Sequence, residues 1–292
     1  MKKGGRFAVD GQGLRKGGSY ALYALRRSPL SLIGILLVAI IMLVAIFAPW
    51  IAPYSPYKIS MQERYEPPSF QHLAGTDSLG RDVFSRVVHG SRISLRIAVT
   101  AVSISLTIGV VLGALAGFYG GILDMVIMRI TDGFLAIPSF VLALVAAAVF
   151  GPSLVNLIWA ISLVMWTWNA RIVRAAVLGF RSSEFILIQN ALGSPPLRTI
   201  AKHIIPNCSG PILVQASLQF GLSILTSAGL SFLGVGVQPP LPDWGLMVAE
   251  GRQFLPGYWW LVTFPGLAIF LLVAGFLLMG DGLRDVIERE VS

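Results

Sequence analysis

The chain has 292 residues, of which 55% are apolar and only 12% are charged, where soluble globular proteins carry about 25% charged residues. This composition excludes an ordinary soluble enzyme. The formal net charge of +8 would suggest a nucleic-acid partner for a soluble chain, but here the basic residues gather in segments that flank uncharged runs. We therefore expect a lipid membrane, and no nucleic acid, around this chain.

Residues that commonly build chemical sites are scarce. Cys208 is the only cysteine, which excludes an internal disulfide, and His72, His89 and His203 lie too far apart for a metal-ligand spacing. None of the five lysines is followed by Ser or Thr, so no phosphate-binding loop is present. The nearest match to a nucleophile elbow, 229–233, lacks its last glycine. We expect no catalytic residue, metal or cofactor in this chain.

Uncharged windows long enough to cross a bilayer predict an all-α integral membrane protein with six transmembrane helices. The first follows a polar tail that is too long for a cleavable signal, so we expect it to remain as an anchor. A Gly-Pro-Ser turn signal at 151–153 divides the longest window in two. The expected spans are 30–50, 97–123, 134–150, 154–170, about 211–236 and 253–280.

The basic residues predict the orientation of these spans. Seven of the 22 basic residues precede residue 30, where Asp10 is the only acid, and the 171–206 loop carries five basic residues against Glu184. The positive-inside rule places both segments in the cytoplasm. The 52–92 loop is also basic, but helix parity places it outside. Both termini are therefore expected to be cytoplasmic.

Glycines recur every four residues in the second predicted span, at Gly109, Gly113, Gly117 and Gly121. This spacing lines them along one helix face and predicts close packing against another helix. The alternative is that glycine is simply common in membrane helices.

No predicted helix centre carries an ionisable residue, which disfavours an ion-coupled secondary carrier. An intramembrane enzyme is disfavoured because no nucleophile and base pair is apparent. Asp124, Arg129 and Asp132 precede the third span, and the spacing of Arg129 and Asp132 predicts an interfacial ion pair more than a proton relay.

The segment from Glu184 to Asn207 is unusually apolar for a cytoplasmic loop. Its apolar residues recur at helical intervals on either side of Gly193-Ser194-Pro195-Pro196, which predicts two short helices joined by a sharp turn. Such a loop indicates a protein partner; the alternative is a hairpin that lies on the membrane surface.

This loop also resembles a known family. Gly193 followed by the Ile205-Pro206-Asn207 ending is similar to the "EAA" loop of the membrane subunits of binding-protein-dependent ABC importers. Over about residues 30–285 the chain resembles the C-type permeases of the peptide/nickel group. The other matching strings are Gly75-Thr76-Asp77-x-Leu79-Gly80-Arg81-Asp82, Ser85-Arg86, Gly90-x-Arg92-x-Ser94-Leu95, Met128-Arg129 followed by Pro138, Leu230-Ser231-Phe232-Leu233-Gly234, Gln238-Pro239-Pro240, Trp244-Gly245 and Gly280-Asp281-Gly282-Leu283-Arg284-Asp285.

The resemblance implies a permease subunit with the type I ABC importer fold in a bacterial or archaeal cytoplasmic membrane. It implies four partners: a homologous permease, with which the chain encloses the substrate path, two ATPase subunits, which bind ATP and Mg, and an extracytoplasmic binding protein. The transport core would be 96–282, containing the coupling loop 184–206. The tail 1–29, the first helix and external loop at 30–95, and the tail 283–292 would lie outside it. Peptides, nickel complexes, glutathione and sugars all stay open as substrates.

The resemblance also implies which residues face the ATPase. The chain departs from the family where Leu187-Ile188-Gln189 replaces Glu-Ala-Ala, and Glu184, one helical turn earlier, is our candidate for the missing acid. The implied ATPase-coupling residues are Glu184, Phe185, Leu187, Ile188, Gln189, Ala191, Leu192, Gly193, Pro195, Leu197, Ile205 and Pro206.

Polar residues on apolar helices are candidates for the lining of the substrate path. We single out Asn156, Gln215, Gln219 and Ser223, with Asn169 as a further candidate. Helix-to-helix hydrogen bonding is the alternative role for each of them. Gln215 and Gln219 are i,i+4 neighbours and share a face. A second group, Asp243 and Trp244, follows the fifth span and is the candidate for an external mouth, although Trp244 also fits an interfacial anchor.

Overall fold

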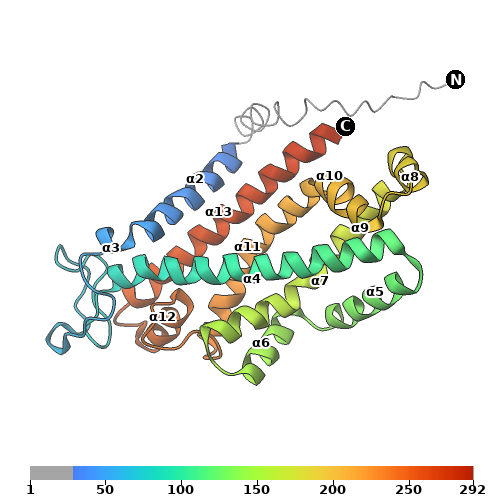
Figure 1. Ribbon diagram of the computed structural model, residues 1–292. Coiled ribbons are helices and arrows are strands. Elements are labelled where there is room, and N and C mark those ends of the chain that lie inside the picture. The colour runs from blue at the N-terminus through green and yellow to red at the C-terminus, as the bar shows by residue number, and fades with distance from the viewer. Residues whose placement is uncertain (1–28, 292) are drawn as a thin grey trace.

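The computed structural model describes residues 29–291, and within them every regular element is a helix (Figure 1). Two segments outside the main helices recur below: residues 52–82, which we call the cap, and residues 184–207, which we call the hairpin. The helices are α2 (Pro29–Ile46), α3 (Ala48–Ile51), α4 (Val83–Tyr119), α5 (Gly121–Leu135), α6 (Ser139–Phe150), α7 (Leu154–Arg181), α8 (Glu184–Ala191), α9 (Pro196–Thr199), α10 (Ile205–Asn207), α11 (Ser209–Phe232), α12 (Trp244–Gly251) and α13 (Trp260–Val291).

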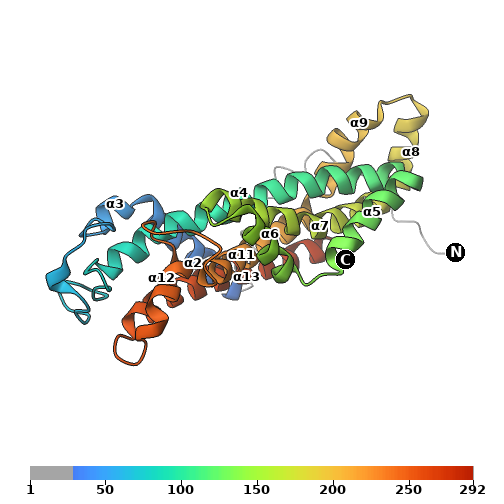
Figure 2. The same cartoon turned by 90° about the horizontal axis from the view of Figure 1, so that it is seen from below.

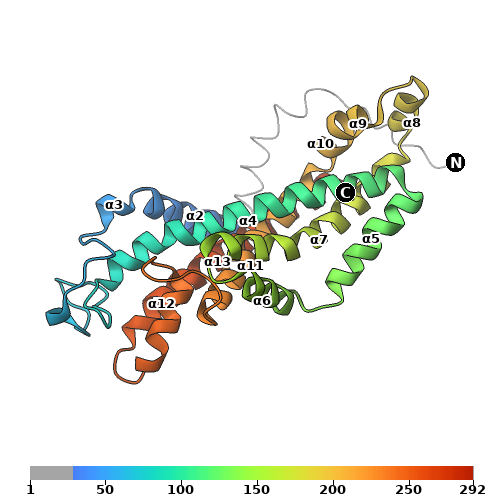
Figure 3. The same ribbon diagram turned by 60° about the horizontal axis from the view of Figure 1, so that its bottom comes forward.

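The helices form an elongated bundle with the cap and α12 at one end and the hairpin at the other (Figures 1 and 2). The start of α2 and the end of α13 both lie toward the hairpin end. Figure 3 shows α4 and α7 running side by side along the bundle, while α5 and α6 diverge from them.

Helix lengths agree with an integral membrane fold. Four helices, α2, α4, α11 and α13, are long and apolar enough to cross a bilayer, and the bent pair α5–α6 counts as a fifth span. The 28-residue α7 is about 42 Å long but too polar for the same criterion. The all-α membrane fold is thus confirmed, with four or five candidate spans by this criterion, and α7 covers the sixth expected span at 154–170.

The second span differs from its prediction at both ends. Asp82 caps α4 by accepting a hydrogen bond from the backbone N–H of Ser85, so the helix begins at Val83 and runs through the boundary expected near residue 96. It ends at Tyr119 because Gly120 takes φ +67°, a conformation that favours glycine. Residues 83–92, expected in a loop, are therefore helical.

The third span is the one predicted least well. Instead of one helix over 134–150, the chain forms α5 and α6, which meet at a bend of 88°. Pro138 causes the break, because it lacks an N–H and disfavours helical geometry at Ile137. The expected helix thus loses its first residues to α5.

The glycine face packs as predicted over three of its four positions. A Cβ at Gly109, Gly113 or Gly117 would come within 2.3–2.9 Å of atoms of α7, so only glycine allows this approach. Gly121 lies beyond the end of α4 and has no atom within 4 Å of its ideal Cβ. Close helix packing is confirmed, and Gly121 is not part of it.

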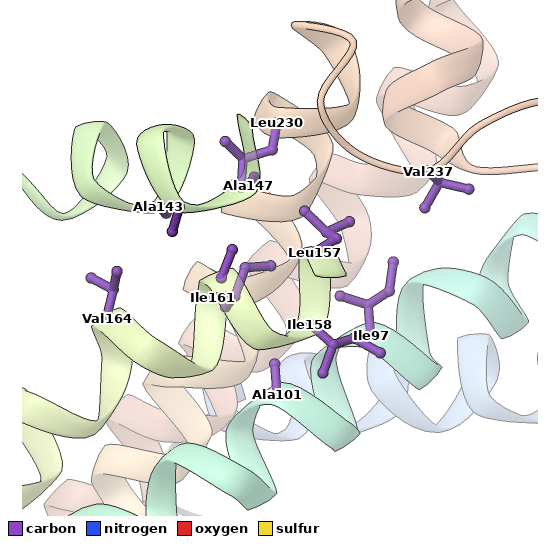
Figure 4. Packing of buried hydrophobic residues seen from close by; sticks show 12 residues of the cluster. Ile97, Ala101, Ala143, Ala147, Leu157, Ile158, Ile161, Val164, Leu230 and Val237 are labelled. Carbon is purple, nitrogen blue, oxygen red and sulfur yellow. The ribbon is translucent and has the colours of Figure 1, made fainter. Parts of the chain in front are cut away.

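Buried aliphatic residues pack the cap-side half of the α4–α7 pair against α6 and α11 (Figure 4). Ile97 and Ala101 of α4 lie against Leu157 and Ile161 of α7, in a cluster that Ala143 and Ala147 of α6 and Leu230 complete. Alanines on α6 keep the helices close. This packing holds α7 against α4, α6 and α11.

Candidate functional site

The hairpin consists of two short helices and a tight turn, as expected. Gly193 ends α8 with φ +75°, and Pro196 occupies the first turn of α9, where its missing N–H costs nothing. A π-helical turn at Ile200–Ile204 and α10 then join α9 to α11. Such turns break the regular helix and are frequent at functional sites.

One face of the hairpin is anchored to the bundle. Ile186, Ile200, Ile204 and Cys208 are buried against the ends of α4 and α7. Their partners there are Ala114, Phe118, Val173 and Val177. Because both hairpin arms contribute to this cluster, the hairpin is fixed to two long helices at once.

The opposite face presents large apolar side chains to the outside. Leu192 is 77% exposed and Leu197 is 67% exposed, and Phe185 and Ile188 are also exposed. An exposed apolar surface on a well-anchored support is typical of a protein-docking site. Of the other predicted residues, Glu184, Ala191, Gly193, Pro195 and Pro206 are exposed and Gln189 and Ile205 are half-buried, while the side chain of Leu187 lies outside the described part.

Two of the pore candidates lie in helix packing. Gln219 of α11 is 2% exposed, accepts a hydrogen bond from Asn169 Nδ2 at 3.0 Å, and donates to the backbone oxygen of Met165. Ser105 of α4 joins the same cluster at 3.4 Å. Ser223 is buried and donates to its own helix. In this structure Gln219 makes hydrogen bonds between helices, the alternative role considered for these residues, and Ser223 bonds within its own helix; their pore-lining role stays a prediction.

The other two candidates have different surroundings. Asn156 donates from Nδ2 to the backbone oxygens of Phe150 and Gly151, and so it caps the end of α6 from the first turn of α7. Gln215 is half-exposed on α11, one turn from Gln219, and stays a pore-lining candidate.

Asp243 and Trp244 are also buried. Asp243 caps α12 by accepting from the backbone N–H of Leu246, and burial raises the pKa of its carboxyl. The indole of Trp244 donates to the backbone oxygen of Val87 and lies against Gly90. Both side chains are buried here: Asp243 caps α12, and Trp244 joins it to α4, while the external-mouth role stays a prediction.

A buried ionic cluster at the cap end escaped the sequence reasoning. Asp77 Oδ2 lies 2.6 Å from Arg81 Nε and 2.8 Å from Arg86 Nη1, and Glu250 of α12 lies 3.4 Å from both arginines. The cluster borders a small pocket lined also by Ser78 and Phe254. The matching strings at 75–82 and Ser85-Arg86 contain three of its members, Asp77, Arg81 and Arg86, but nothing in the sequence linked them to Glu250.

Ion pairs near the hairpin end join α5 to α7. Arg174 binds Asp124 through two hydrogen bonds, and Arg171 binds Asp132. The predicted pair between Arg129 and Asp132 is therefore wrong: Asp132 pairs across helices. Within residues 29–291, no group of three His, Cys, Asp or Glu side chains is placed to hold a metal.

Two known families match this chain. Residues 109–292 match the family described as binding-protein-dependent transport system inner membrane component, and residues 18–68 match the N-terminal TM domain of oligopeptide transport permease C. The chain belongs to this permease family. Members of this family are inner membrane components of binding-protein-dependent transport systems, and the long apolar helices of this chain fit a membrane component.

Curated relatives cover nearly the whole chain. The chain is similar to the dipeptide transport system permease protein DppC of Alkalihalophilus pseudofirmus, with 43% identity over 93% of this chain and 90% of that protein. It shares 45% identity with DppC of Escherichia coli K12, over 91% of both chains. The di/tripeptide permease DppC of Pseudomonas aeruginosa is 43% identical over 89% of this chain and 88% of its own length.

Proposed function

We propose that the chain is one of two permease subunits of an ATP-driven importer of short peptides, and that it couples to its ATPases through the hairpin. The observation that carries the coupling role is the exposed apolar face of Phe185, Ile188, Leu192 and Leu197 on a hairpin anchored to α4 and α7. The names of the relatives, which specify dipeptides and di/tripeptides, support the substrate class.

The hairpin is built to pass motion to the bundle. Its buried residues Ile200 and Ile204 are followed by Cys208, which directly precedes α11, and the π turn with Pro206 gives the junction a break in regular helical bonding. A displacement at Leu192 would therefore shift α11 against α4 and α7. Such a rearrangement between two packed states converts ATPase closure into opening of the substrate path.

The hairpin and the cap lie on opposite sides of the membrane and meet different partner subunits. The hairpin end faces the cytoplasm, where two ATPase subunits bind ATP and Mg, and both tails lie on that side. The cap faces the extracytoplasmic binding protein. A homologous permease completes the path, and this chain itself holds no nucleotide. The transport core is 96–282, with the first helix and cap as an additional N-terminal part.

Affinity purification of the tagged chain in mild detergent tests this proposal. We expect a second permease and ATPases with Walker motifs to copurify, with ATP hydrolysis in the eluate. Ile188→Asp should remove the ATPases and keep the second permease, whereas Ile40→Asn on the distant α2 should keep both. A chain that purifies alone after gentle crosslinking would overturn the proposal.

A further inference from the structure

One face of α4 is exposed along most of the helix. Its exposed residues recur every three or four positions, so they form a single stripe, which we call the α4 stripe. The stripe consists of Arg92, Arg96, Val99, Ser103, Thr107 and Val111, with the half-exposed Thr100 beside it. Figure 1 shows α4 running the length of the bundle from the cap toward the hairpin.

The α4 stripe differs from a face that meets lipid. Every exposed residue of α2 is apolar, as the bilayer requires, among them Leu36, Ile40 and Leu43. Four of the six members of the α4 stripe, Arg92, Arg96, Ser103 and Thr107, carry polar or charged side chains. Two apolar-rich helices of one bundle therefore expose surfaces of opposite character.

Arg92 marks the depth of the stripe. Its guanidinium donates to the backbone oxygens of Ala45 and Ile46 at the end of α2, and the exposed Trp50 follows four residues later in α3. Tryptophans of this kind mark a membrane–water interface. Arg96 lies one turn, about 6 Å, farther along α4, and Thr107 about 22 Å from Arg92. The stripe thus extends from the interface deep into the span.

Arg96 has no counter-charge within the described residues. Its guanidinium makes no hydrogen bond or ion pair there, and the buried acids at the cap end are engaged with other residues: Asp77 with two arginines and Asp82 with His72. An unpaired arginine is costly in hydrocarbon, and such residues usually face a water-filled cavity. The exposed Ser103 and Thr107 continue the same polar surface.

Resting on the proposed function, we infer that the α4 stripe lines the aqueous substrate path and that Arg96 takes the carboxylate of a passing peptide near its outer opening. A guanidinium offers paired N–H donors that match a carboxylate. The hydroxyls of Thr100, Ser103 and Thr107 provide the weaker, exchangeable contacts that suit a moving peptide. Gln215, half-exposed on α11, is not required for this surface.

Cysteine labelling in the membrane-embedded complex tests the inference. The native Cys208 is fully buried, and burial raises the pKa of its thiol to about 11, so it reacts little. Single variants Ser103→Cys and Thr107→Cys should react with charged, water-soluble methanethiosulfonates in the resting or the ATP-trapped state. Ile40→Cys on α2 serves as the lipid-facing control, and Gln71→Cys in the cap as the aqueous control.

The charge of Arg96 is tested separately, by comparing the labelling rates of anionic and cationic reagents at a neighbouring cysteine. At Thr100→Cys, one turn away, an anionic reagent should react faster than a cationic one of equal size. Arg96→Gln should lower that rate ratio by roughly tenfold, since one charge about 6 Å away changes each rate by about threefold in water. Arg96→Lys should restore most of the ratio.

Two results would overturn the inference. Stripe cysteines that react no faster than Ile40→Cys in both states would show that lipid or the second permease covers this face, and crosslinking to that permease would tell which. An unchanged rate ratio in Arg96→Gln would remove the carboxylate site. Both outcomes are independent of copurification with ATPases, which tests the proposed function itself.

Discussion

Arg86 donates from Nη1 to the carboxylate of Asp77 across 2.8 Å, and the arginine side chain is only 1% exposed. Because Arg81 binds the same carboxylate, removing Asp77 leaves two buried guanidinium groups without it. We expect Asp77→Ala to lower the free energy of unfolding by about 3–5 kcal/mol. Thermal unfolding of the purified chain in detergent measures this.

Asp132→Asn provides the control, because the pair between Asp132 and Arg171 is about half exposed. Exposed pairs contribute about 0–1 kcal/mol, so this variant should unfold within a few degrees of the wild type. Equal effects of Asp77→Ala and Asp132→Asn would contradict the view that the cap is held by its buried charges.

The contact of Gly113 with α7 gives a second prediction. A Cβ there would meet the backbone oxygen of Ala170 at 2.5 Å, and backbone cannot move aside cheaply. Gly113→Ala should destabilise the fold by about 1–3 kcal/mol. Gly133→Ala on α5 is the matched variant: its Cβ meets nothing within 4 Å, so better helix propensity should stabilise it slightly. Unfolding temperatures that shift in the same direction would count against the close packing.

The sequence predicted these packed helices better than it predicted their polar contacts. Glycines every four residues from Gly109 to Gly117 indicate a helix face, because helical period and residue size are local properties. The hydrogen-bond partner of Gln219, by contrast, is not a local property of the sequence, because it lies on another helix. The sequence around an amide in an apolar helix is the same whether the amide faces a pore or hydrogen-bonds to another helix. Only the folded structure shows that Gln219 lies next to Asn169.

Two other features, the ionic cluster and the bend between α5 and α6, were not predicted because the sequence shows only local patterns. Asp77 and Glu250 lie far apart in the chain, so their shared arginines could not be foreseen. The bend near Pro138 was missed because the apolar run continues across it. By contrast, the hairpin was predictable from apolar spacing on both sides of Gly193, and its exposed apolar residues follow from that spacing.

The hydrogen bond between Asn169 and Gln219 gives a third prediction. Replacing Gln219 with Leu leaves the Asn169 amide group without its strongest partner, which should cost about 1–3 kcal/mol. The double variant Asn169→Leu with Gln219→Leu should cost less than the sum of the two single variants. A double-mutant cycle of unfolding free energies measures the difference. Additive effects would show that the two side chains act separately.

Asp243 should make stability depend on pH. Burial raises the pKa of this carboxyl in the folded state, so the folded chain holds the proton more tightly than the unfolded chain. The contribution of Asp243 to stability is present below its unfolded pKa and is lost as the pH rises through its folded pKa. Asp243→Asn keeps a cap acceptor and lacks the titration.

Unfolding temperatures of wild type and Asp243→Asn between pH 4 and 8 test this sign. Relative to the variant, the wild type should lose stability as the pH rises. A wild type that gains stability over Asp243→Asn across the same range would mean that the folded state favours the charged carboxylate.

Glu184 is the candidate for the acid that the coupling loop otherwise lacks. Its side chain is exposed at the start of α8, one turn before Ile188. Glu184→Ala should therefore leave folding unchanged and lower peptide-stimulated ATP hydrolysis in the complex. Glu63→Ala in the cap is the control for loss of an acid far from the hairpin. Unchanged transport in Glu184→Ala would remove this role.

The central claim is that this chain is an ATP-driven peptide permease, and uptake into proteoliposomes tests it most directly. The purified complex, with its binding protein and a radiolabelled dipeptide, should accumulate the peptide only when ATP is present on the hairpin side. Leu192→Asp should abolish accumulation while the complex stays folded. Uptake by this chain alone, driven by a proton or sodium gradient and indifferent to ATP, would contradict the account.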